Sequence, residues 1–209
     1  MSKFQSTKDL HVTWDQYNKK IEELAIQIYN DGYEFNQIVC IAKGGLRVGD
    51  ILSRIFDVPF AVMSVESYHG EGKKDEQGQI VFGNSLAKTS PNLGNKVLLV
   101  DDLADSGTTL EKCVKWLQHY EGFFIDELKT ATVWVKGVST FTPDYYTDFL
   151  STSPWIHQPF EKYETMTIEE IRDNWFEEDH IADKAAEEQL QYWIDKAKGK
   201  HVDTQGVKD

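Results

Sequence analysis

The sequence predicts an α/β fold built on a parallel sheet with helices on both faces. Two observations carry this prediction: apolar runs of strand length recur along the chain, and segments with helical periodicity separate them. The runs are residues 35–42 (FNQIVCIA), 59–66 (PFAVMSVE), 97–100 (VLLV) and 128–135 (LKTATVWV). Strands covered on both faces are largely apolar throughout rather than alternating, which is typical of a parallel sheet.

Three helical segments precede or separate these runs. The first begins at Thr13, which forms a capping-box pattern with Gln16, and it ends at Gly32. Residues 46–56 and 108–120 also have a helical pattern. Each lies between two predicted strands, as the crossover connections of a parallel sheet require.

Two stretches interrupt the alternation. Residues 68–95 are polar and glycine-rich, which is typical of a functional loop or lid in a compact domain. After Gly137 the chain is irregular and aromatic through Tyr163. Residues 165–209 form an acidic extension with two helical patterns, so we expect one domain over residues 1–164 and a helical appendage after it.

Composition excludes several classes of function. The formal net charge of −13 disfavours binding to nucleic acid or to an anionic membrane surface. No apolar run is long enough to span a bilayer, and the N-terminal residues lack an apolar targeting segment. Cys40 and Cys113 lie in apolar segments and are expected to be buried free thiols. These features predict a soluble cytoplasmic protein without membrane association.

The third apolar run opens a motif, VLLVDDLADSGTTL, over residues 97–110. Ligands of open parallel sheets bind beyond the carboxyl ends of the strands, where Asp101 and Asp102 are expected. Adjacent carboxylates are tolerated where they accept hydrogen bonds from sugar hydroxyls or face a divalent cation. Residues 106–109 add hydroxyls and helix N-terminal amides that suit a phosphate dianion. The motif predicts a site for a phosphorylated sugar, with solvated aspartates before an ordinary helix cap as the alternative.

This motif resembles the phosphoribosyl pyrophosphate (PRPP) signature of the type I phosphoribosyltransferases. Three further matches occur in family order: the turn AKGG at residues 42–45, the pair SY at residues 67–68, and the run WIHQPFE at residues 155–161. They resemble the pyrophosphate turn, the start of the mobile catalytic loop, and the purine-recognition segment of 6-oxopurine enzymes, most of all the bacterial xanthine-guanine and hypoxanthine phosphoribosyltransferases. The resemblance implies a Rossmann-like core with a small hood formed by terminal segments, and the helical extension is an addition to it.

For the PRPP motif the resemblance implies a division of labour. Asp101 and Asp102 face the ribose hydroxyls and a Mg²⁺ ion, and Asp105 is the general acid or base at the purine N7. The 5′-phosphate is held by the residues of the following turn: Ser106, Gly107, Thr108 and Thr109.

The resemblance also implies roles for the turn at residues 42–45 and for the pair at residues 67–68. Lys43 and the Gly44 amide contact pyrophosphate, together with Ala42, and the family often has a cis peptide between Ala42 and Lys43. Ser67 and Tyr68 belong to the loop that closes over the site and excludes water, and they count as catalytic by this resemblance.

The acceptor side rests on fewer residues. By this resemblance Lys136 donates a hydrogen bond to the purine O6, and Trp155 stacks on the ring. The backbone at Ile156 contacts the 2-position. Glu161 binds a second Mg²⁺. Each has a simpler alternative: a solvated lysine for Lys136, ordinary packing for Trp155, and a surface carboxylate for Glu161.

The resulting hypothesis is a purine-salvage enzyme that transfers phosphoribose from PRPP to hypoxanthine, guanine or xanthine and releases pyrophosphate, with Mg²⁺ as cofactor. The resemblance also implies a homo-oligomer, either a dimer or a tetramer. A transferase for another base and a PRPP-sensing regulator of the same fold stay open. His157 departs from the bacterial pattern, which has an acidic residue there, and could alter the preference among the three purines.

Overall fold

The computed structural model describes residues 9–68, 79–83, 85–89, 92–119, 124–177 and 184–199. The chain divides into two compact units, residues 1–159 and residues 160–209. The first contains the sheet and the second contains three helices, α4 (Lys162–Thr165), α5 (Ile168–Glu177) and α6 (Lys184–Ala197). Among the described residues, no helix is both long and apolar enough to cross a membrane.

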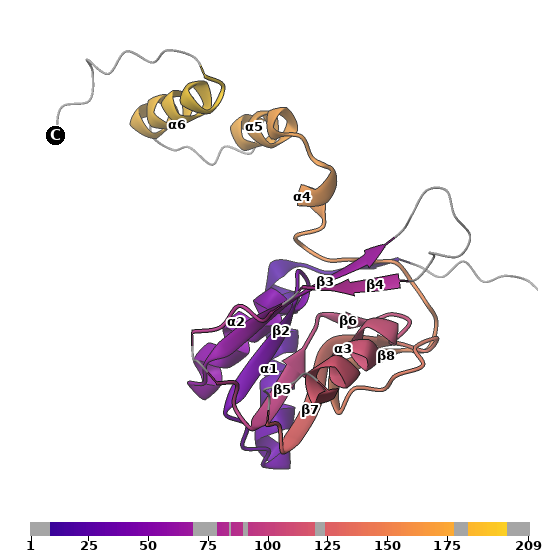
Figure 1. The fold of residues 1–209 in the computed structure, drawn as a ribbon. Coiled ribbons are helices and arrows are strands. Elements are labelled where there is room, and N and C mark those ends of the chain that lie inside the picture. Colours follow the sequence, from indigo (N-terminus) through magenta and orange to yellow (C-terminus); the bar gives the residue numbers. More distant parts are fainter. Residues whose placement is uncertain are drawn as a thin grey trace, which may run out of the picture. The chain divides into compact units, whose positions relative to one another are not determined.

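The first unit is built around one mixed sheet that is mostly parallel (Figure 1). Its strands, in sheet order, are β4 (Gln79–Phe82), β3 (Phe60–Tyr68), β2 (Gln37–Ala42), β5 (Lys96–Val100), β7 (Glu127–Lys136) and β6 (Leu103–Ala104), with β8 (Tyr145–Leu150) also paired to β7. Among these described strands, β4 alone runs antiparallel to its neighbour. The predicted α/β class is confirmed.

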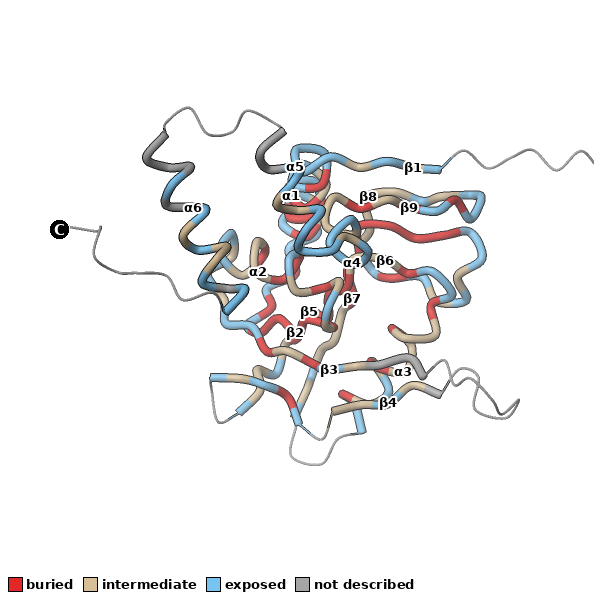
Figure 2. The backbone as a smooth tube through the Cα atoms, turned by 90° about the horizontal axis from the view of Figure 1, so that it is seen from above, coloured by how far each residue is buried: buried red, intermediate tan, exposed pale blue. Residues whose placement is uncertain are grey.

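Helices cover both faces of this sheet, as predicted. On one face α3 (Thr108–His119) packs Leu110, Cys113 and Leu117 into an apolar cluster with residues of β2, β3 and β5. Alternate residues of the same strands face α2 (Gly45–Phe56), where Gly49 lies directly over Cys40. The central strands β2 and β5 are accordingly buried except at Ala42 and Lys96, which are half-buried (Figure 2).

The first helix, α1 (Trp14–Asp31), forms where the sequence predicts it. Thr13 and Gln16 make both hydrogen bonds of the capping box, and Gly32 ends the helix with φ +71°. Its apolar stripe is fully buried, and the buried residues are Tyr17, Ile21, Leu24, Ala25 and Ile28. The helix packs against β7 and β8 and also contacts α2.

Both stretches that the sequence left without regular structure contain strands of the main sheet. β4 lies inside the predicted loop 68–95, where it pairs with the end of β3; residues 69–78, 84, 90 and 91 of that loop lie outside the described part. The prediction of irregular structure after Gly137 is wrong for β8, which pairs in parallel with β7. β8 is mostly half-buried, so its polar and aromatic sequence lacks the apolar run that marks the central strands.

A second, two-stranded sheet joins distant parts of the chain. β1 (Leu10–His11) pairs in parallel with β9 (Ile156–His157), so the residues before α1 lie beside the WIHQ segment (Figure 2). The pairing is extended by hydrogen bonds from the Leu10 N–H to the Trp155 carbonyl and from the Val12 N–H to the His157 carbonyl. This small sheet is the hood that the resemblance implied.

Candidate active site

The carboxyl ends of three parallel strands bring the predicted donor and acceptor residues to one edge of the sheet. Cys40 of β2 pairs with Val100 of β5, which in turn pairs with Ala131 of β7. The aspartates after β5 therefore lie level with the last residues of β2, directly before the turn. β7 continues past that level and ends at Lys136.

The turn after β2 lies against the aspartate pair. The Ala42–Lys43 peptide is cis, as the resemblance implied, and Lys43 is exposed. Gly44 approaches Asp102 so closely that a Cβ atom at Gly44 would lie 2.1 Å from Asp102 Oδ1. Only glycine fits this approach with Asp102 in its present position.

The two aspartates have different environments. Asp101 is 8% exposed, and its carboxylate accepts hydrogen bonds from the backbone N–H groups of Gly45 and Asp102, the latter at 3.0 Å. Burial raises the pKa of Asp101 well above its usual range, and the neighbouring charge of Asp102 raises it further. Asp101 thus ties the turn after β2 to the end of β5. Asp102 is only partly buried, so its carboxylate is the more accessible of the two.

The loop after Asp102 forms a small cradle before α3. Gly107 has φ +79°, and a Cβ atom there would lie 2.5 Å from Ser139 Oγ, so the turn requires glycine. Ser106 Oγ accepts from the Thr108 N–H at 3.3 Å, and the Ser106 carbonyl accepts from the Thr140 N–H. The loop encloses a cavity of about 80 Å³ lined by Asp101, Leu103, Ala104, Asp105, Ser106, Gly107, Thr109 and Leu110. Its size, hydroxyls and position before a helix suit one phosphate group.

Asp105 and Lys136 come together through β6. Ala104 of β6 pairs with Val135 of β7, so the next residues along the chain, Asp105 and Lys136, lie beside each other. Lys136 Nζ donates to Asp105 Oδ2 at 3.0 Å. Lys136 is 6% exposed, whereas the Asp105 side chain is 58% exposed. The alternative of a solvated lysine is wrong, because this ammonium group is buried and paired with the predicted acid-base residue.

The predicted purine-recognition segment lies in the hood. Trp155 is 64% exposed and therefore free to offer a ring face, which excludes core packing as its role. Ile156 is buried, and its backbone lies in β9. The His157 ring stacks on His11 with centroids 4.3 Å apart and approaches Asp9 Oδ2 at 3.1 Å. His157 thereby holds the two strands of the hood together.

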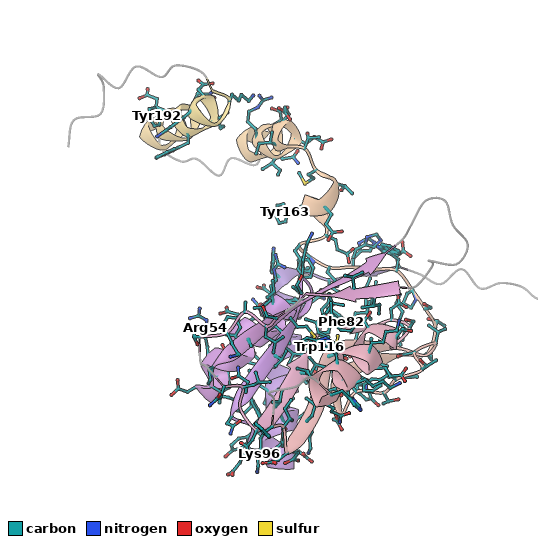
Figure 3. The ribbon with its side chains drawn as sticks, in the orientation of Figure 1. Arg54, Phe82, Lys96, Trp116, Tyr163 and Tyr192 are labelled. Atoms are coloured by element: carbon teal, nitrogen blue, oxygen red, sulfur yellow. The ribbon has the colours of Figure 1, made fainter. Side chains whose placement is uncertain are left out.

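The structure gives the positions of three further predicted residues, Ser67, Tyr68 and Glu161, and their roles stay predictions. Ser67 and Tyr68 end β3, three and four residues beyond Ser64, which pairs with Ala42; their backbone thus continues past the edge that carries Lys43. The adjacent β4 is fixed to α3 by the stacking of Phe82 on Trp116, with centroids 5.8 Å apart (Figure 3). Glu161 directly precedes α4 in the second unit.

Comparison with known proteins identifies the fold and the family. The family described as phosphoribosyl transferase domain matches residues 13–165. The chain belongs to this phosphoribosyltransferase family. Xanthine-guanine phosphoribosyltransferase of Ruegeria sp. (strain TM1040) is 31% identical over 160 residues, covering 74% of this chain and 86% of that protein. The corresponding protein of Cereibacter sphaeroides (strain ATCC 17025 / ATH 2.4.3) is 32% identical over 158 residues, covering 74% and 87%.

A solved structure supports the same assignment for this phosphoribosyltransferase. The purine phosphoribosyltransferase from Pyrococcus horikoshii Ot3 superposes with a TM-score of 0.59 at 28% identity, covering 73% of this chain and 93% of that one. At 22% identity the Helicobacter pylori xanthine-guanine-hypoxanthine phosphoribosyltransferase, with a TM-score of 0.60, shows the shared fold.

One residue of the phosphoribosyltransferase site has no role in the sequence-based prediction. Gln158, at the end of the hood segment, is 7% exposed and donates from Nε2 to Asp102 Oδ2 at 2.5 Å. Its place in the WIHQPFE run was visible in the sequence. Its partner was not, because Asp102 lies 56 residues away along the chain.

Proposed function

We propose that this member of the phosphoribosyltransferase family is a purine-salvage enzyme that transfers phosphoribose from PRPP to hypoxanthine, guanine or xanthine. The observation that supports it best is the Lys136–Asp105 pair, which places a buried donor and an exposed carboxylate 3.0 Å apart at the edge of the sheet. A 6-oxopurine carries an acceptor, O6, and a ring nitrogen, N7, side by side, so one base can engage both groups.

The donor side binds PRPP in three places. The cavity before α3, lined in part by Ser106, Gly107 and Thr109, takes the 5′-phosphate, because amides at the start of α3 and nearby hydroxyls offer hydrogen bonds to a dianion. We assign the ribose hydroxyls mainly to Asp102, because Asp101, to which the resemblance gives the same role, is 8% exposed and fixes the adjacent turn. Lys43 and the Gly44 amide contact pyrophosphate.

Transfer breaks the bond between C1′ and the pyrophosphate oxygen and forms the bond between C1′ and N9 of the purine. As N9 attacks, N7 loses its proton to the Asp105 carboxylate, and Lys136 donates a hydrogen bond to O6. Trp155 stacks on the ring, and the backbone at Ile156 contacts the substituent at the 2-position. Ser67 and Tyr68, at the end of β3, help to exclude water that would otherwise hydrolyse PRPP.

The donor set fits a magnesium ion that is bound mainly by the substrate. The described residues contain no group of three or more His, Cys, Asp or Glu side chains that could hold a metal alone. Mg²⁺ commonly uses one or two carboxylates together with substrate oxygens and waters, which Asp102 and PRPP can supply. When bound, the ion offsets the negative charge of the departing pyrophosphate. Glu161 is our candidate for a second ion.

The proposal extends to location and assembly. The two cysteines are buried free thiols, which fits a reducing cytoplasm. We expect a dimer or a tetramer, which light scattering of the purified protein would measure.

The decisive experiment offers the purified protein Mg²⁺, PRPP and one base at a time, and follows nucleotide formation. The bases are hypoxanthine, guanine, xanthine, adenine, uracil and orotate. Turnover confined to the three 6-oxopurines is the expected result. Turnover with another base would overturn the acceptor assignment, and PRPP binding without turnover of any base would favour a regulator of the same fold.

A further inference from the structure

Gln158 joins the two halves of the site. It follows β9 directly, in the segment proposed to contact the purine, yet its amide reaches Asp102, which is proposed to contact the ribose. The Asp102 carboxylate is enclosed on both sides: Oδ2 accepts from Gln158, and Oδ1 faces the backbone of Gly44. Rotation of the carboxylate would break the contact with Gln158.

We propose that Gln158 is a positioning residue that sets the orientation of the Asp102 carboxylate and thereby strengthens PRPP binding. The inference rests on the proposed PRPP site. An ionised carboxylate accepts hydrogen bonds only, so the contact with Asp102 requires the amide NH₂ group to face it. Gln158 therefore fixes the orientation in which the Asp102 carboxylate faces the ribose.

The other end of the amide indicates that Gln158 does not serve stability. Gln158 Oε1 is buried and has no hydrogen-bond partner among the described residues. A buried acceptor without a partner is unfavourable for folding, and an apolar side chain of similar size would avoid that cost. The Oε1 atom of Gln158 is thus unfavourable for folding, while its Nε2 atom donates to Asp102.

The Gln158→Met variant should therefore weaken PRPP binding without lowering the stability of the protein. Methionine keeps the length and volume but removes the donor, so the Kd for Mg²⁺–PRPP, measured by calorimetry without any base, should rise about tenfold. The KM for the purine should stay within about twofold, because the β1–β9 pairing uses backbone groups. The melting temperature should stay equal or rise.

A double-mutant cycle tests whether Gln158 acts through Asp102. In an Asp102→Ala background, which removes the acceptor, Gln158→Met should cause no further loss of PRPP binding. Gln37→Met is the matched control: Gln37 is also buried, at 2% exposure, but it lies at the opposite end of β2, and its replacement should leave the Kd for PRPP unchanged. Gln158→Leu serves as a second variant if methionine does not fold.

Three results would overturn the inference: an unchanged Kd for PRPP in Gln158→Met, a fall in melting temperature with equal rises in both substrate constants, or additive losses in the cycle. Wild-type protein that does not bind PRPP would contradict the proposed function as well. Wild-type protein that binds PRPP but transfers it to no base would contradict only the proposed function.

Discussion

The donor side and the acceptor side of the site are built in different ways. The donor side consists of contiguous loops directly after central strands, with Asp101 buried and Gly44 and Gly107 in positions that admit no side chain. The acceptor side gathers residues from separate elements, among them Lys136 at the end of β7 and Trp155 beside β9. The donor cradle is therefore fixed by the core, while the acceptor contacts are divided between β7 and the hood.

The largest effect is expected where the two sides meet, at Asp105. Asp105→Asn keeps the shape and can still contact Lys136, but it cannot accept a proton from N7. We expect kcat to fall by roughly 10²–10⁴ with the Kd for PRPP unchanged, measured by steady-state kinetics and calorimetry. An unaltered kcat would remove Asp105 from proton transfer and leave the pair with Lys136 as a structural contact.

The next effect should be confined to the acceptor. Lys136→Met removes the proposed donor to O6, so kcat/KM for hypoxanthine should fall roughly 10- to 100-fold without a change in PRPP binding. Lys129→Met is the matched control, because Lys129 lies at the other end of β7 and pairs with Asp31 at 2.7 Å. Equal losses in both variants would mean that β7 is merely destabilised.

The same contrast explains what could be predicted from the sequence. The donor motif and the central strands were predicted because their residues are contiguous and apolar runs mark buried strands. β8 and the β1–β9 pairing were missed, since half-exposed strands carry no apolar run. The contact between Gln158 and Asp102 depends on how distant segments pack, and no local pattern records it.

Substitutions of the adjacent glycines Gly44 and Gly45 should affect different properties, PRPP binding in the first case and stability in the second. In Gly44→Ala the new Cβ meets the Asp102 side chain, which can rotate away, so the Kd for PRPP should rise about tenfold while the protein stays folded. In Gly45→Ala the Cβ would lie 2.3 Å from the Val100 carbonyl oxygen, which cannot move without the strand. This variant should lose about 1–3 kcal/mol of unfolding free energy by denaturant titration. Identical behaviour of the two variants would contradict the separation.

The smallest effect is expected at Trp155, and it tests whether the exposed ring binds the base. Trp155→Ala should raise the KM for guanine about fivefold, the scale of one lost aromatic stacking contact, and should leave the melting temperature unchanged because the side chain is 64% exposed. Trp193, which is 54% exposed on α6, provides the control: Trp193→Ala should change neither quantity. A lower melting temperature with an unchanged KM would give Trp155 a structural role in the hood, and base selection would then rest on Lys136 and the backbone at Ile156.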